Sequence, residues 1–89
     1  MSFLKKLFGG GQPQAAQGVD HAGFTIFAQP QRDGSVYRIA ARIERDVDGT
    51  TKTHQMIRAD TLQDESDAKA ASVAKAKQII DEQGLRIFD

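Results

Sequence analysis

The sequence predicts an α+β domain in which a three-stranded antiparallel meander carries one C-terminal helix on one face, in the order β-β-β-α. Two observations lead to this fold class. Apolar and polar residues alternate in three segments between residues 23 and 61, as in strands that bury one face. Residues 64–83 instead repeat their apolar side chains at three- and four-residue spacing, which indicates a helix packed on the sheet.

The first strand is expected over residues 23–29. Its two sides carry Phe24, Ile26 and Ala28 against Thr25, Phe27 and Gln29. Pro30 lacks the N–H that a ladder needs, so we expect it to end the pairing of this strand. Residues 32–35, Arg-Asp-Gly-Ser, are typical of a turn.

The second and third strands, residues 36–46 and 51–61, flank Asp48-Gly49, a strong hairpin signal. A two-residue turn would place Ile39 opposite Arg58 and Ile43 opposite His54. A three-residue loop, residues 47–49, would pair Asp46 with Thr50, Ile39 with Ile57 and Arg38 with Arg58. A slip of one residue inverts a whole strand, and the second register separates apolar from charged side chains better, so we predict the second.

The helix is expected to begin after Asp64 as N-cap, with acidic residues in its first turn, and to end at Gly84. Its apolar face comprises Ala68, Ser72, Val73, Ala76, Ile79 and Ile80. Leu85 is expected to fold back on the helix end. Residues 85–88 are expected to be extended, as a short terminal fourth strand or a core plug.

Residues 1–8 and 9–18 stand apart from the domain of residues 19–89. Residues 9–18, GGGQPQAAQG, have the composition of a flexible Gly/Gln linker. Residues 1–8 form an amphipathic leader, which as a helix would separate apolar side chains from lysines. An isolated helix of this length is unstable in water, so the leader would order only on a membrane surface or in a partner's groove. The alternative is a frayed leader that has no role. The candidate docking residues are Phe3, Leu4, Lys5, Lys6, Leu7 and Phe8.

Composition narrows the class of protein. The 89 residues allow one domain, and twelve basic residues balance twelve acidic ones, which argues against a wholly basic DNA-binding surface. The absence of cysteine excludes disulfides and thiolate metal sites and favours the cytoplasm. No apolar run is long enough for a signal peptide or for the ~20 residues of a membrane span, so we expect no transmembrane segment.

Several stretches resemble the HlyU family of small bacterial proteins, which are named as activators of haemolysin transcription. They are MSFLKKLFGGG, GFTIFAQP, VYRIAARIE, VDGTTKTHQMIRADT and AKQIIDEQGLRIF. The similarity covers nearly the whole chain, and YRIAARIE and HQMIRAD are its most specific parts. The resemblance implies cytoplasmic regulation of gene expression through DNA.

One helix can cover only one face of the sheet, so the other face is the candidate binding surface. In the predicted register it carries Phe27, Arg38, Arg42, Lys52, His54 and Arg58, together with Ala40, Glu44 and Met56. Arginines interleaved with an aromatic side chain suit an anion, a single-stranded nucleic acid or a protein partner. Ion pairs between Arg38 and Asp60 and between Glu44 and Lys52 would instead make this an ordinary solvated face.

No catalytic, metal or cofactor site is expected. His21 and His54 have no metal-ligand spacing, and no serine has a nucleophile setting. A single helix also excludes a helix-turn-helix, which needs two. Two function classes therefore stay open, a regulator acting through nucleic acid and a protein-interaction or membrane-peripheral adaptor.

Overall fold

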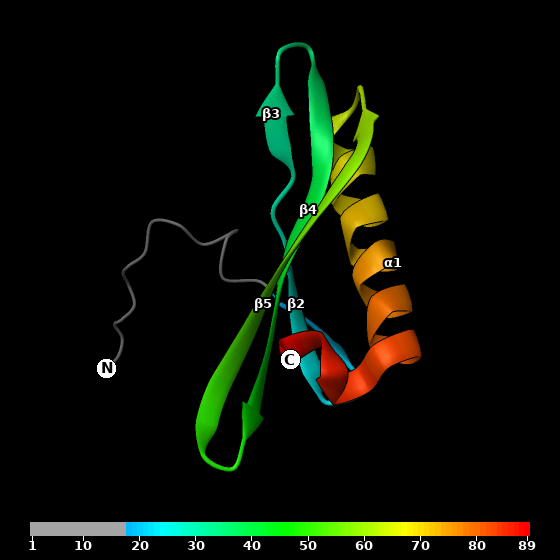
Figure 1. The fold of residues 1–89 in the computed structure, drawn as a ribbon. Helices are drawn as coiled ribbons and strands as arrows, with labels where there is room; N and C mark the ends of the chain where they lie inside the picture. The colour runs from blue at the N-terminus through cyan, green and yellow to red at the C-terminus, as the bar shows by residue number, and fades with distance from the viewer. Residues whose placement is uncertain (1–17) are drawn as a thin grey trace, which may run out of the picture.

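The computed structural model describes residues 18–89, which form five strands, one α-helix and one 3₁₀ helix (Figure 1). The elements are β1 (Val19–His21), β2 (Phe24–Ala28), β3 (Gln31–Asp33), β4 (Val36–Val47), β5 (Thr50–Leu62), α1 (Glu65–Gln83) and η2 (Gly84–Phe88). The sheet is antiparallel and twisted, and α1 lies along one of its faces (Figure 1). The α+β class and the single C-terminal helix are confirmed.

The prediction of three strands is wrong, because β1 and β3 join the sheet as well. β1 pairs with β2, with Val19 opposite Ile26. β3 occupies part of the segment expected to be a turn. Ala28 pairs with Ala41, and after Pro30 the same register resumes with Gln31 opposite Arg38. Pro30 therefore interrupts the pairing along this edge of β4 and does not end it, and only residues 34 and 35 remain for the turn.

The predicted β4–β5 register is also wrong. Val47 pairs with Thr50, so Asp48 and Gly49 form a two-residue turn, and both have positive φ, 54° and 82°. Two successive left-handed residues are the geometry of a type I′ turn, whose twist matches that of the strands. The preference of Asp-Gly for a two-residue turn therefore sets the register. The prediction had instead chosen the register that best separates apolar from charged side chains.

A register shift in the middle of the hairpin changes which residues of β5 lie opposite the start of β4. Ala40 pairs with Ile57, but Arg38 pairs with Thr61, so two steps along β4 correspond to four along β5. Arg38 is therefore not opposite Arg58, as was predicted. The irregularity lies between Arg38 and Ala40, and beyond it Leu62 comes opposite Tyr37.

The helix follows the sequence prediction closely. The Asp64 carboxylate accepts a hydrogen bond from the Asp67 N–H at 3.0 Å, which caps the first turn, and Gly84 closes the last one at a φ of 56°. The predicted inner face is confirmed, with Ala68, Ser72, Ala76 and Ile80 buried. Small residues on this face let the helix axis approach the sheet closely.

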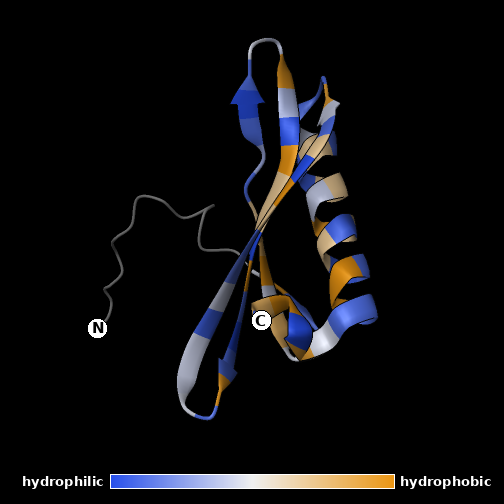
Figure 2. Cartoon of the chain, in the orientation of Figure 1, coloured by the Kyte–Doolittle hydropathy of each residue, from blue (hydrophilic) through white to orange (hydrophobic). Residues whose placement is uncertain are grey.

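The core lies between α1 and the covered face of the sheet. It is formed by Phe24, Ile26, Ile39, Ala41, Ile43, Met56, Ala76, Ile80 and Ile87. Figure 2 shows hydrophobic residues along β4, whereas β3 is hydrophilic along its length. The sheet residues of the core therefore come from β2, β4 and β5, whereas β3 is exposed and polar.

The C-terminal segment is helical, which corrects the expectation of an extended tail. Its role as a core plug is confirmed, because Ile87 is buried and the ring of Phe88 stacks on Phe24 with centroids 5.9 Å apart. Leu85 does not fold back as expected and stays 49% exposed.

Candidate functional site

The face of the sheet opposite α1, called here the open face, carries side chains from β2, β4 and β5. Each strand alternates, so the open face receives Phe27 from β2, Arg38 and Arg42 from β4, and Gln55 and Ile57 from β5. No α-helix of the described residues 18–89 lies on this side (Figure 1). Within residues 18–89 the open face is therefore not covered by a helix, which makes it the candidate surface for a partner.

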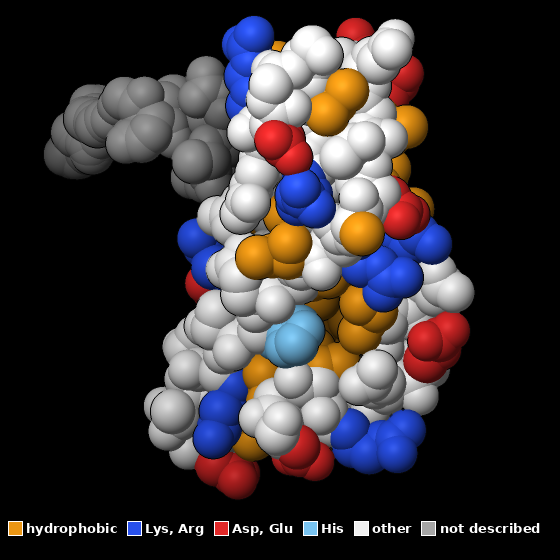
Figure 3. Space-filling model, turned by 45° about the horizontal axis from the view of Figure 1, so that its top comes forward, with side chains coloured by type: hydrophobic (Ala, Val, Ile, Leu, Met, Phe, Trp, Pro, Cys, Tyr) orange, Lys and Arg blue, Asp and Glu red, His pale blue; other side chains and the backbone are white. Residues whose placement is uncertain are grey.

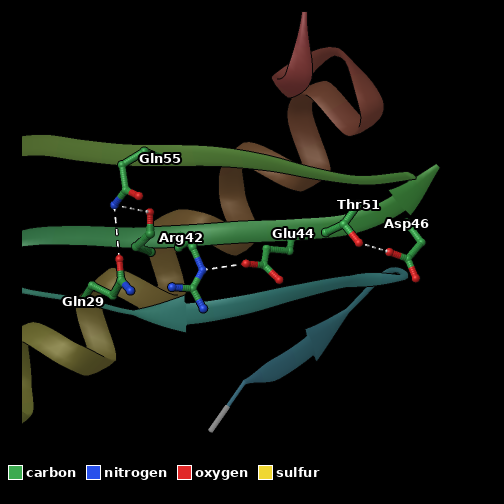
Figure 4. Close-up of polar contacts among 7 residues, drawn as sticks. Gln29, Arg42, Glu44, Asp46, Thr51 and Gln55 are labelled. Atoms are coloured by element: carbon green, nitrogen blue, oxygen red, sulfur yellow. Dashed lines mark hydrogen bonds and ion pairs between the residues drawn. The ribbon is translucent and has the colours of Figure 1, made fainter. Parts of the chain in front are cut away.

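Phe27, Arg42 and Glu44 form one cluster on the open face (Figure 4 shows the two charged residues). The Arg42 guanidinium lies 4.3 Å from the centre of the Phe27 ring, and its Nε lies 2.7 Å from a carboxylate oxygen of Glu44. This N···O contact is short enough for an ion pair, but it lacks the alignment of a hydrogen bond. Arg42 is about one-third exposed, so the pair contributes at most ~1 kcal/mol.

Arg38 also has a carboxylate partner within the domain. Its guanidinium donates to the Asp33 carboxylate at 2.7 Å, across the turn that joins β3 to β4. The prediction had given Arg38 a diagonal partner in Asp60, which belonged to the incorrect register. Both arginines that lie on the open face thus have a carboxylate partner within the domain.

The remaining polar side chains of the open face also contact one another. The Gln55 amide donates to the Gln29 side chain at 3.3 Å, and the Thr51 hydroxyl donates to Asp46 at 2.6 Å (Figure 4). Near Asp46 lies a shallow polar depression of about 440 Å³ lined by Gly23, Thr25, Glu44, Arg45, Asp46 and Thr51. Its two carboxylates are those already held by Arg42 and Thr51.

Three of the six residues predicted for the candidate binding surface do not lie beside Phe27, Arg38 and Arg42 on the open face. The two-residue turn inverts the first part of β5, so Lys52 and His54 project on the side of α1, together with the buried Met56. Lys52 lines a small groove with Val47, Leu85 and Phe88 beside η2. Arg58 is exposed within the register shift. Phe27, Arg38 and Arg42 lie on the open face as predicted, and of these three only Phe27 and Arg42 contact each other.

The histidines have separate surroundings. His21 contacts the Asp81 carboxylate at 2.8 Å and so links β1 to α1, whereas His54 lies opposite Ile43 on the covered side of the sheet. Within residues 18–89, no group of three or more histidine, aspartate or glutamate side chains is placed to hold a metal ion.

Sequence reasoning missed the exposure of Ile57 and the contacts of Arg45. Ile57 was expected in the core, yet it lies on the open face and is 54% exposed. Arg45 was not considered, although it lies 4.9 Å from the centre of the Phe24 ring and donates to the Ala22 carbonyl. The Asp-Gly dipeptide was the available signal for the turn, and choosing its two-residue form would have identified Ile57.

Basic and acidic side chains are nearly equal in number in the described residues. Lys5 and Lys6 lie outside the described residues, so residues 18–89 contain ten basic and all twelve acidic side chains. In the view of Figure 3, basic and acidic side chains are intermixed around hydrophobic ones near a histidine. The candidate leader, residues 1–8, and most of the predicted linker fall outside the described residues. Within residues 18–89, no helix combines the length and apolar character required to cross a membrane.

Comparison with known proteins provides a family. A family model described as transcriptional activator HlyU matches residues 2–88. The search of curated proteins and the search of solved structures each found no match. The family model covers nearly the whole chain.

Proposed function

The chain belongs to the HlyU family of transcriptional activators, and we propose that it regulates transcription by binding another protein through the open face of its sheet. This proposal rests on the contacts that the two arginines of the open face make with carboxylates of the same domain. Arg38 and Arg42 each lie 2.7 Å from a carboxylate of the same domain. DNA phosphates would have to displace these carboxylates, which lowers the gain from each new contact.

The aromatic side chain of the open face is occupied as well. A base stacks on an exposed ring face, but the Arg42 guanidinium already covers one face of Phe27 at 4.3 Å. The only α-helix of residues 18–89 has Glu65 and Asp67 in its first turn and packs its apolar face on the sheet. Such a helix is poorly suited to enter the major groove of DNA.

A protein partner fits the same surface better. Ile57 is exposed beside Gln55, and interface centres combine an apolar residue with hydrogen-bonding groups and few unpaired charges. A regulator of transcription acts where RNA polymerase and its DNA are, so we place this protein in the cytoplasm.

The test compares two matched substitutions of exposed apolar residues. Ile57→Asp alters the open face, and Leu85→Asp introduces the same charge beside η2. Each variant replaces the wild-type protein in the organism that encodes it, and the transcripts that change on deletion of the gene are measured. We expect Ile57→Asp to behave like the deletion and Leu85→Asp like the wild type.

A second pair of measurements examines nucleic acid directly. Arg38→Gln with Arg42→Gln should leave the regulated transcripts unchanged, and labelled duplex or single-stranded DNA should bind weakly at low salt. Salt-dependent DNA binding that these two substitutions abolish, together with loss of regulation, would contradict the proposal. The basic-face prediction made from the sequence would then be the better account.

The amphipathic leader, residues 1–8, remains a separate proposal for membrane or partner docking. Liposome flotation of the full chain and of a chain without residues 1–11 tests the membrane form. Equal recovery of the two proteins with the vesicles would exclude that role.

A further inference from the structure

The outer edge of β5 is long and uncovered. β5 has thirteen residues, and all except His54 and Met56 are exposed. One edge of β5 pairs with β4, and no other strand of residues 18–89 pairs with the opposite edge. A long edge of this kind exposes a row of backbone N–H and C=O groups that can template another strand.

The two-residue turn between β4 and β5 determines which backbone N–H and C=O groups of β5 point away from β4. In a two-residue hairpin the closing pair, Val47 and Thr50, exchanges hydrogen bonds, and so does every second pair after it. The backbone groups of the intervening residues of β5 therefore point away from β4; these residues are Thr51, Thr53, Gln55 and Ile57. The register shift adds two residues to β5, so the alternation is preserved and Thr61 also points outward.

The side chains of β5 are complementary to those of a second β5 running antiparallel. If residues 58–60, which have no partner in β4, keep the alternation of the strand, a two-fold axis at Met56 would bring Lys52 of one copy opposite Asp60 of the other, and this pair would occur twice. Oppositely charged residues directly across an antiparallel pair are stabilising, whereas like charges are destabilising. In the same register the two exposed Ile57 side chains are diagonal neighbours on the open face, close enough to contact each other.

From the uncovered edge and this complementarity we propose that the protein forms a homodimer in which β5 pairs with β5 of a second copy, giving one continuous sheet. A two-fold axis perpendicular to the sheet places both α1 helices on the same side. The two open faces then join into one surface centred on the Ile57 pair. The inference extends the proposed function, because the partner-binding surface would span both copies.

The first test uses two substitutions at Thr53, whose outward N–H bonds to the second copy. Thr53→Pro removes that N–H, while Thr53→Ala keeps it, and neither affects the bonds between β5 and β4. Molar mass by light scattering and sedimentation should give a dimer for the wild type and Thr53→Ala and a monomer for Thr53→Pro. Circular dichroism checks that each variant keeps its fold.

The second test exchanges charges. Lys52→Glu and Asp60→Lys each place like charges opposite one another twice per dimer, so each should raise the dimer dissociation constant roughly tenfold or more. The double variant restores both opposite pairs and should return the constant to the wild-type value. This rescue distinguishes direct pairing from a general loss of stability.

A wild-type protein that stays monomeric at all concentrations would overturn the inference, as would a dimer that Thr53→Pro and the charge exchange leave unchanged. These outcomes are independent of the proposed function. A monomer whose Ile57→Asp variant loses regulation would refute the dimer alone. A dimer whose Ile57→Asp variant still regulates transcription would refute the partner-binding face alone.

Discussion

Ser72 shows how one polar side chain can be required in a thin core. It is fully buried on α1, where its hydroxyl donates to the Ala68 carbonyl at 2.7 Å and accepts from the Ala40 N–H at 3.1 Å. The second bond crosses from the helix to the backbone of β4, next to the register shift. Ser72 therefore satisfies a backbone donor that lies inside the domain, away from water.

Ser72→Ala should lower the free energy of unfolding by about 1–3 kcal/mol, because the buried Ala40 N–H loses its acceptor. Urea denaturation followed by circular dichroism measures the change. Ser66→Ala is the matched control, since Ser66 is exposed in the first turn of the same helix and alanine favours helix formation. Equal stability of the two variants would mean that the Ser72 bond contributes nothing.

At the scale of the element, the β4–β5 hairpin decides which side chains of β5 enter the core. The type I′ turn places Met56 opposite Ala41, where it is 3% exposed, and turns Ile57 to the open face. The large side chain of Met56 fills the space that the small Ala41 leaves. Ile57, the next residue and of similar size, is exposed on the open face.

Paired substitutions in β5 test this register. Met56→Ala should destabilise the domain by about 2–5 kcal/mol, since it opens a cavity in the core, whereas Ile57→Ala should cost less than about 1 kcal/mol. Thermal or urea unfolding measures both. The register expected from the sequence reverses the order of the two effects, so a larger loss for Ile57→Ala would contradict the structure.

At the scale of the whole molecule, residues 18–89 contain a sheet, a covering helix and a closing plug. Phe24, the first residue of β2, stacks on Phe88 near the end of the chain, so segments far apart in the sequence are joined through the core. Domains of this size bury only about 60–65% of their unfolded surface, so stability depends on every element being present.

A chain of residues 18–89 should fold alone, with a free energy of unfolding within about 0.5 kcal/mol of the full chain, because substitutions remote from a core have effects of that size. Urea denaturation of both proteins checks this. The same comparison tests the predicted boundary between linker and domain. A marked loss of stability would show that residues 1–17 contribute to the fold.

For the whole molecule, the proposed function is inferred from the family and from the surfaces that the fold leaves uncovered. The match to HlyU activators spans residues 2–88, and the surfaces proposed for contacts within residues 18–89 are the open face and the outer edge of β5. Three arginines were predicted for the binding surface. Arg38 and Arg42 lie on the open face, whereas Arg58 lies in the register shift. The carboxylate partners of Arg38 and Arg42 were not predicted, because Asp33 was assigned to a turn and Glu44 was expected to pair with Lys52.

The sequence by itself determined the elements whose signals are local. The α+β class, the helix with its Asp64 cap and inner face, and the alternation in β2 and β4 depend on contacts a few residues apart, so composition and spacing reveal them. Only the tertiary structure decided the β5 register, the two additional strands and the helical C-terminus. A turn of two residues or three reverses a whole strand, and a later shift in register leaves no mark in the spacing of apolar residues.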